Sequence, residues 1–136
     1  MRVALEMRLT GSSQILLAPQ LNNSLGTISI EVLTTIVTPD QEWRSFMQQL
    51  TDRWTSYRSP AKGEPYLNAR PHWAKEWQGL MVRGKPIENY LRESAYRLER
   101  KEFVKVLEEV VKKRGGTLEE TKERFGNPLL ERLFFQ

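Results

Sequence analysis

Large apolar side chains alternate with smaller or charged ones along Arg2-Val3-Ala4-Leu5-Glu6-Met7-Arg8-Leu9. Successive side chains of a β-strand point to opposite faces, so this alternation predicts a half-buried strand whose reverse face carries Glu6 and Arg8. Residues 27–33 alternate in the same way and predict another strand. A short strand is also predicted at Gln14–Ala18, where Pro19 would stop it. The N-terminal third is therefore expected to form an antiparallel sheet.

The pattern changes to helical spacing after residue 38. Thr38-Pro39-Asp40-Gln41 combines a capping threonine, a proline suited to the first helical position and a glutamine that completes a capping box. One face of the predicted helix then carries Trp43, Phe46, Met47, Leu50, Trp54 and Tyr57. Such a stripe could line a ligand site, but it is far more often core, and we interpret it as the surface that packs on the sheet.

The C-terminal third is predicted to be helical. Pro86 can open a helix, and a second apolar stripe continues until Gly115-Gly116 ends it. Residues 117–120 form a further capping box, which predicts a short helix that Gly126 terminates. The last residues are strongly apolar and are expected to dock on something.

These patterns together predict an α+β fold, in which an antiparallel sheet with helices packed on one face precedes a C-terminal helical segment. The 136 residues are expected to form one domain.

The composition excludes several kinds of chemistry. The chain has no cysteine and a single histidine, His72, so thiol nucleophiles, thiolate ligands and mechanisms with two imidazoles are excluded, and no metal site is expected. Its glycines form neither of the common phosphate-binding motifs. No apolar run approaches the ~18 residues of a membrane helix and no signal peptide is evident, so an intracellular location is expected. Acids and bases interleave despite the net charge of +4, so nucleic-acid binding ranks last.

Two groups of residues are candidates for chemistry. Glu6 and Arg8 share a strand face at a spacing of about 6.5–7 Å, where an acid and a cation can hold a polyhydroxylated ligand. A solvent-exposed ion pair is the alternative interpretation, and for this pair alone it is the more common case.

The second candidate group lies in residues 58–84, which lack periodicity and are rich in proline and glycine. Within them, Arg70-Pro71-His72-Trp73-Ala74-Lys75 offers a titratable imidazole and a cation, either of which can contact a group that becomes negatively charged. A lone histidine beside a tryptophan is also commonly structural. Residue type and spacing leave both interpretations open.

The segment Asn68–Lys75 resembles the Arg/Lys-Pro-His-Trp-Gly/Ala-Lys signature of the FAD-linked aldonolactone oxidases, a family that includes the D-arabinono-1,4-lactone and L-gulonolactone oxidases. Residues 5–8 resemble the Glu-x-Arg strand of that family, and residues 16–19 are similar to the segment that follows it. The order and approximate spacing agree over residues 3–77.

This resemblance implies a two-domain flavoenzyme, of which residues 1–136 would be the substrate-binding domain without its FAD-binding domain. The family transfers hydride from the substrate carbon beside a hydroxyl to flavin, and some relatives associate with membranes. By motif, Glu6, Arg8 and Lys75 would be catalytic and would also bind the sugar lactone, and His72 would lie at the cofactor. An FAD-binding domain, in the same chain or a separate one, would then be the partner, and the isolated chain would be inactive.

Two departures from the family pattern affect these expectations. Ile28-Ser29-Ile30-Glu31 lacks the His-x-Thr pair of the alditol-oxidising relatives, which leaves Ser29 and Glu31 as substrate-binding candidates. Arg124-Phe125-Gly126-Asn127 is only a distant match to the family's Asp-Pro-x-x-x-Phe-x-Asn ending. A non-catalytic protein-interaction domain is the alternative function, and convergence of Glu6, Arg8 and Lys75 on an open concave face would favour the enzyme.

Overall fold

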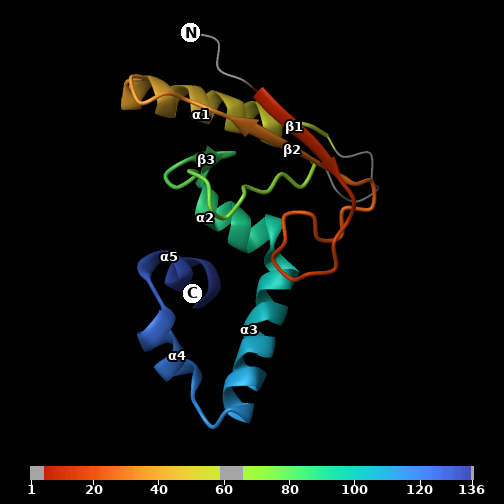
Figure 1. The fold of residues 1–136 in the computed structure, drawn as a ribbon, viewed down its shortest axis with the longest axis vertical. Coiled ribbons are helices and arrows are strands. Elements are labelled where there is room, and N and C mark those ends of the chain that lie inside the picture. The colour runs from red at the N-terminus through yellow and green to blue at the C-terminus, as the bar shows by residue number, and fades with distance from the viewer. Residues whose placement is uncertain (1–4, 59–65, 136) are drawn as a thin grey trace.

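The computed structural model describes residues 5–58 and 66–135 and has an α+β fold (Figure 1). Strands β1 (Leu5–Thr10) and β2 (Thr27–Val32) pair antiparallel, with Met7 opposite Ile30. The two predicted strands are confirmed, although Arg2 to Ala4 lie outside the described residues. Every residue of β1 is exposed, so the expected burial of its apolar face was wrong.

The predicted strand at Gln14–Ala18 was also wrong. The connection between β1 and β2 folds into turns and makes a single parallel bridge, from Ser13 to Leu21. Its backbone groups bond locally, as in the 3.0 Å hydrogen bond from the Leu21 N–H to the Ala18 carbonyl. Local turns therefore use the groups that a strand would have offered to a neighbour, and Leu21 becomes buried.

Helix α1 (Asp40–Thr55) confirms the predicted helix but not its capping box. Pro39 is the N-cap residue, and no side chain caps the helix. The Thr38 hydroxyl lies 3.3 Å from that of Thr35, which removes it from the capping role.

The packing of α1 also differs from expectation. Among the described residues, α1 contacts β3 (Met81–Val82) rather than β1 or β2. The Gln48 amide forms two hydrogen bonds with the Met81 backbone, at 2.8 and 2.9 Å. Phe46 is exposed because this small hairpin covers only part of the helix, and Tyr57 is exposed beyond the end of the helix at Thr55.

The core lies below α1 in Figure 1, around β3, β4 (Lys85–Pro86) and the helical segment that follows them. That segment consists of α2 (Ile87–Tyr90), the π-helical turn η1 (Leu91–Ala95) and α3 (Arg97–Lys113). The buried side chains of the core are Trp77, Val82, Ile87, Tyr90, Leu91, Ala95, Tyr96 and Leu133.

The chain then returns to this core. Helix α4 (Leu118–Phe125) begins with the predicted capping box, in which Thr117 and Glu120 bond each other's backbone N–H groups. Helix α5 (Pro128–Leu130) and the π-helical turn η2 (Glu131–Phe135) follow. Leu133 is 3% exposed in the core, so the apolar tail docks within the molecule itself.

Candidate functional site

The β1–β2 hairpin places four candidate residues on one face. Glu6 lies opposite Glu31, and Arg8 lies opposite Ser29. Side chains alternate along a strand, so these two cross-strand pairs lie next to each other on the same side of the sheet. We call these four residues together with Lys75 the charged face.

Lys75 joins this face from a segment 44 residues along the chain, where its ammonium group forms an ion pair with the Glu31 carboxylate. This hydrogen bond and the positive charge of Lys75 lower the pKa of Glu31, and the more distant charges of Arg8 and His72 act in the same direction. The structure thus brings Glu31 and Lys75 together beside the Glu6–Arg8 pair.

Glu6 and Arg8 form an ion pair of their own, with 2.5 Å between Oε1 and Nη2. The hydrogen bond to Glu6 and its charge raise the pKa of Arg8. The side chains of Arg8 and Glu6 are 66% and 49% exposed, so water screens this pair and leaves it accessible to a ligand. The charged face therefore presents two carboxylates and two cations to solvent.

His72 is exposed near the charged face. Its Nδ1 accepts a 3.2 Å hydrogen bond from the Ala74 N–H, and its carbonyl accepts one from the Lys75 N–H at 3.0 Å. These bonds form a tight turn that holds His72 and Lys75 in a defined relation. The imidazole is accessible to a ligand, and the glycines of the chain form neither of the common phosphate-binding motifs.

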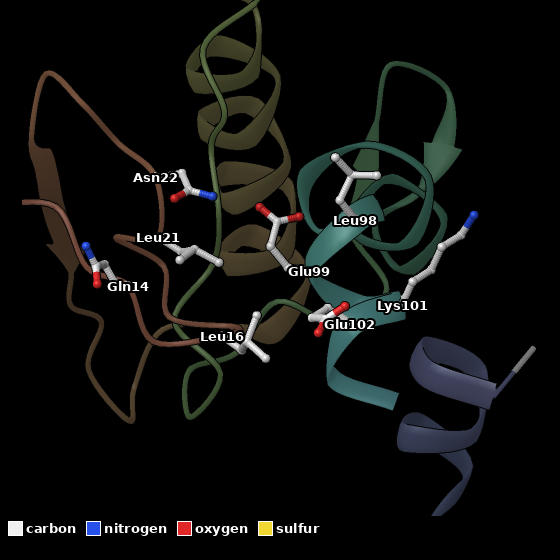
Figure 2. A pocket seen from close by; sticks show the side chains of 8 residues that line it. All are labelled: Gln14, Leu16, Leu21, Asn22, Leu98, Glu99, Lys101 and Glu102. Atoms are coloured by element: carbon white, nitrogen blue, oxygen red, sulfur yellow. The ribbon is translucent and has the colours of Figure 1, made fainter. Parts of the chain in front are cut away.

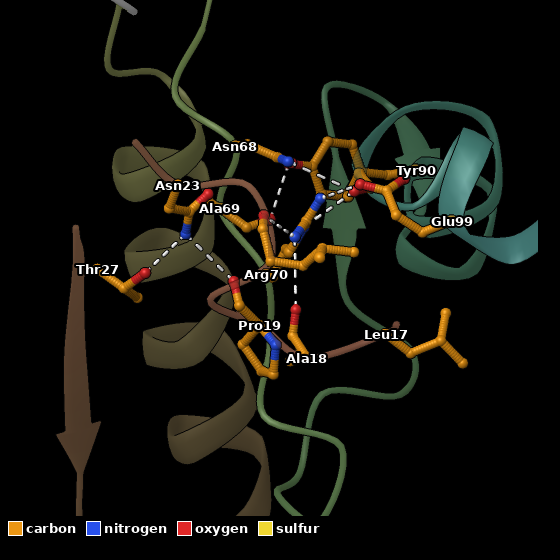
Figure 3. Close-up of polar contacts among 12 residues, drawn as sticks. Leu17, Ala18, Pro19, Asn23, Thr27, Asn68, Ala69, Arg70, Tyr90 and Glu99 are labelled. Atoms are coloured by element: carbon orange, nitrogen blue, oxygen red, sulfur yellow. Dashed lines mark hydrogen bonds and ion pairs between the residues drawn. The ribbon is translucent and has the colours of Figure 1, made fainter. Parts of the chain in front are cut away.

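Arg70 anchors the segment that carries His72 and Lys75 (Figure 3). Its side chain is 3% exposed, and its guanidinium bonds Glu99 at 2.8 Å and the Leu21 and Ala95 carbonyls at 2.9 Å each. The same group lies 4.4 Å from the centre of the Tyr96 ring. A buried cation needs such partners, because an unpaired one would lose its hydration without compensation.

Trp73 is a second anchor. Its ring stacks on Tyr96 with 5.1 Å between centroids, and its indole N–H donates to the Leu17 carbonyl at 2.8 Å. Within 70–75, Arg70 and Trp73 therefore hold the segment to the core, while His72 and Lys75 remain outside it.

The sequence did not reveal Arg70 as a structural centre. Its charged partner, Glu99, is 29 residues away, and no local pattern links the two. The proline that follows Arg70 was the only local signal, since it favours an extended backbone at that arginine.

A cavity of about 600 Å³ lies apart from the charged face (Figure 2). Residues of the connection between β1 and β2 form one side and the start of α3 forms the other, and the lining residues are Gln14, Leu16, Leu21, Asn22, Leu98, Glu99, Lys101 and Glu102. None of the predicted site residues lines it. No motif marks these residues in the sequence, so motif reasoning could not have found the cavity.

Two further findings concern membranes and metals. Over residues 5–58 and 66–135, no helix combines the length and apolar character needed to cross a bilayer. The same residues contain no group of three or more histidine, cysteine or acidic side chains placed to bind a metal ion.

Comparison of the chain with known proteins found no relative. No protein-family model, no curated protein and no solved structure matches the chain.

Proposed function

We propose that this chain is the substrate-binding part of an FAD-dependent oxidoreductase that oxidises a sugar 1,4-lactone, as D-arabinono-1,4-lactone oxidases do. One observation carries the proposal: Lys75, in the Pro-His-Trp-x-Lys segment, pairs with Glu31 on the face that also carries Glu6 and Arg8. Two segments that resemble separate motifs of one enzyme family are thus adjacent in space.

The charged face suits a polyhydroxylated ligand. Carboxylates of Glu6 and Glu31 can accept hydrogen bonds from sugar hydroxyl groups, and the Arg8 guanidinium can donate two parallel bonds to lactone oxygens. Ser29 adds a hydroxyl group on the same side. A ligand held in this way would be fixed in both position and orientation.

The reaction removes a proton from a substrate hydroxyl and a hydride from the carbon beside that hydroxyl. The flavin would accept the hydride when it is bound. Glu6 and Arg8 would orient that hydroxyl and assist the loss of its proton. Lys75 would stabilise the negative charge that develops on the oxygen. Because the charged face is open to water, the FAD-binding domain would have to cover it, and His72 would lie at that junction.

The activity is proposed to be intracellular, and the enzyme to attach peripherally to a membrane.

The first test separates the chain from its proposed partner. The isolated chain should show no flavin absorbance in the visible range and no turnover, but it should support lactone oxidation when fused to the FAD-binding domain of an aldonolactone oxidase. No lactone oxidation by the fusion, with its flavin bound, would contradict the proposal.

The second test concerns the site. In the active fusion, Lys75→Ala and Arg8→Ala should each lower kcat by about 10²–10³-fold, the usual effect of losing one donor to a developing oxyanion. Lys85→Ala is the matched control, since Lys85 is similarly exposed and pairs with Glu93 at 2.9 Å away from the charged face. Near-wild-type kinetics for both Arg8→Ala and Lys75→Ala would refute the site.

A protein-interaction domain is the second candidate function. The observation in its favour is the exposed apolar side of β1, where Leu5, Met7 and Leu9 are 64%, 62% and 76% exposed. Amide chemical shifts of the isolated chain distinguish the candidates: a sugar lactone should perturb residues 6, 8, 29, 31 and 75 if the charged face is a substrate site.

A further inference from the structure

The β1–β2 hairpin is an incomplete sheet. Within residues 5–58 and 66–135, neither strand pairs with another strand along its outer edge. A two-stranded sheet without cover is marginal in water, and an unpaired edge presents a row of N–H and C=O groups that another strand can bond. In Figure 1 the hairpin lies at the opposite end of the molecule from α4 and α5.

We propose that β1 pairs antiparallel with β1 of a second copy of this chain. The two hairpins would then form a continuous four-stranded sheet in the order β2–β1–β1–β2, related by a twofold axis. This inference does not rest on the proposed oxidase function, because it uses the free edge and side-chain pattern of β1 alone.

The charge pattern of β1 selects both this partner and one register. If the twofold axis passes Met7, then Glu6 of each copy lies opposite the partner's Arg8, and Leu5 lies opposite the partner's Leu9. Two opposite-charge cross-strand pairs result, and each stabilises an antiparallel pair. The strand is therefore complementary to itself in charge.

The neighbouring registers are disfavoured. In another register, the charged side chains of the two copies stay on the same side of the sheet only if the twofold axis moves along β1 by a whole residue. The reason is that side chains alternate between the two sides with a period of two residues. The axis would then pass Glu6 or Arg8 and place two carboxylates or two guanidinium groups opposite each other. Like charges in directly opposite positions destabilise a sheet, so the Met7-centred register remains.

The apolar side of the hairpin gains from the same pairing. Leu5, Met7 and Leu9 lie opposite Val32, Ile30 and Ile28, so this side is apolar across both strands. In the dimer the two apolar sides would join into one surface, with Met7 of each copy meeting at the centre. Pairing thus covers part of the side chains that water now surrounds.

Charge reversal tests the pairing. Sedimentation of the isolated chain over a concentration series should show a reversible monomer–dimer equilibrium. Glu6→Arg alone and Arg8→Glu alone should each weaken dimerisation by about tenfold or more, because both cross-strand pairs become repulsive. An equimolar mixture of the two single variants should restore a dimer, and so should the double variant.

The outcomes are decisive in either direction. Restored dimerisation in the mixture, with unchanged far-ultraviolet circular dichroism of each variant, supports the pairing. A chain that stays monomeric at every concentration, or single variants that dimerise as well as the wild type, would overturn it.

The register has its own test, because the chain has no cysteine of its own. Met7→Cys should oxidise readily to a disulfide-linked dimer, since the two cysteines would face each other across the axis within disulfide reach. Leu9→Cys is the matched control: in this register its two copies lie about 13 Å apart, too far to bridge. Cross-linking of Leu9→Cys but not of Met7→Cys would contradict the register.

Discussion

Arg70 joins three segments that are far apart in the sequence through one guanidinium group. The Leu21 carbonyl belongs to the connection between β1 and β2, the Ala95 carbonyl ends η1, and Glu99 lies in α3. Since the side chain is nearly inaccessible to water, its charge is stable only while these partners surround it. The position of Lys75 therefore depends on a residue that does not itself reach the charged face.

Loss of the Arg70 side chain should destabilise the fold. Arg70→Ala would leave the Glu99 carboxylate, which is 15% exposed, and two carbonyl groups without their donor, and we expect a loss of about 3 kcal/mol in the free energy of unfolding. Urea denaturation measures this change. Lys85→Ala, which breaks an exposed ion pair, should cost less than ~1 kcal/mol in the same experiment. Equal losses for the two variants would contradict the anchoring role of Arg70.

The helical elements differ in how they are fixed at their ends. Helix α3 ends at Lys113, and Gly115 follows with φ of +76°. The N–H groups of Gly115 and Gly116 bond the Lys112 and Val111 carbonyls. Helix α4 starts at the reciprocal Thr117–Glu120 capping box, whose hydrogen bonds lower the pKa of Glu120. The turn between these helices is thus specified by local sequence alone.

Removal of the cap should act mainly on α4. Thr117→Ala deletes the hydroxyl that accepts from the Glu120 N–H at 3.2 Å, and we expect a loss of about 1 kcal/mol. Faster amide hydrogen exchange in residues 118–125 would locate the effect. Thr117→Ser keeps the hydroxyl and should behave as the wild type, so a similar loss in both variants would point to a cause other than the cap.

Several local signals were confirmed, although the capping box predicted at Thr38 was not. The strand alternation at 27–33, the Thr117 capping box and the Gly126 stop all appear in the structure. The sequence also placed Glu6, Arg8 and Lys75 in one candidate site, although their adjacency was expected from the resemblance rather than from spacing. Phe46 was misjudged because helical periodicity shows which residues share a face, but not how much of that face a neighbour covers. Tyr57 was misjudged because the helix ends before it, at Thr55.

The core of the whole molecule is made by side chains from residues 77–96 together with Leu133. Tyr96 is 2% exposed in that core, and its ring contacts both the Trp73 ring and the Arg70 guanidinium. Burial raises the pKa of Tyr96 to about 12, from an ordinary value of 10.0. Its hydroxyl is buried with no hydrogen-bond partner among the described residues.

Tyr96 should make the whole fold sensitive to alkali. Because its pKa is higher in the folded state, its contribution to stability is present below pH 10 and is lost as the pH rises towards 12. Unfolding free energies measured across this range should fall less steeply in Tyr96→Phe than in the wild type. At neutral pH that variant should be at least as stable, since it removes an unpaired buried hydroxyl. Identical slopes in the two proteins would exclude this role.

The π-helical turn η1 has a consequence for where the following helix begins. Tyr96, the residue after η1, has φ of −131° and ψ of 25°, so a non-helical residue separates η1 from α3. Its N–H bonds the Leu91 carbonyl at 2.9 Å, and its carbonyl accepts from the Arg100 N–H at 2.8 Å, so the backbone hydrogen bonds continue across the break. The break therefore restarts the winding at Arg97, and this new start places Glu99 where the buried arginine finds its counter-ion.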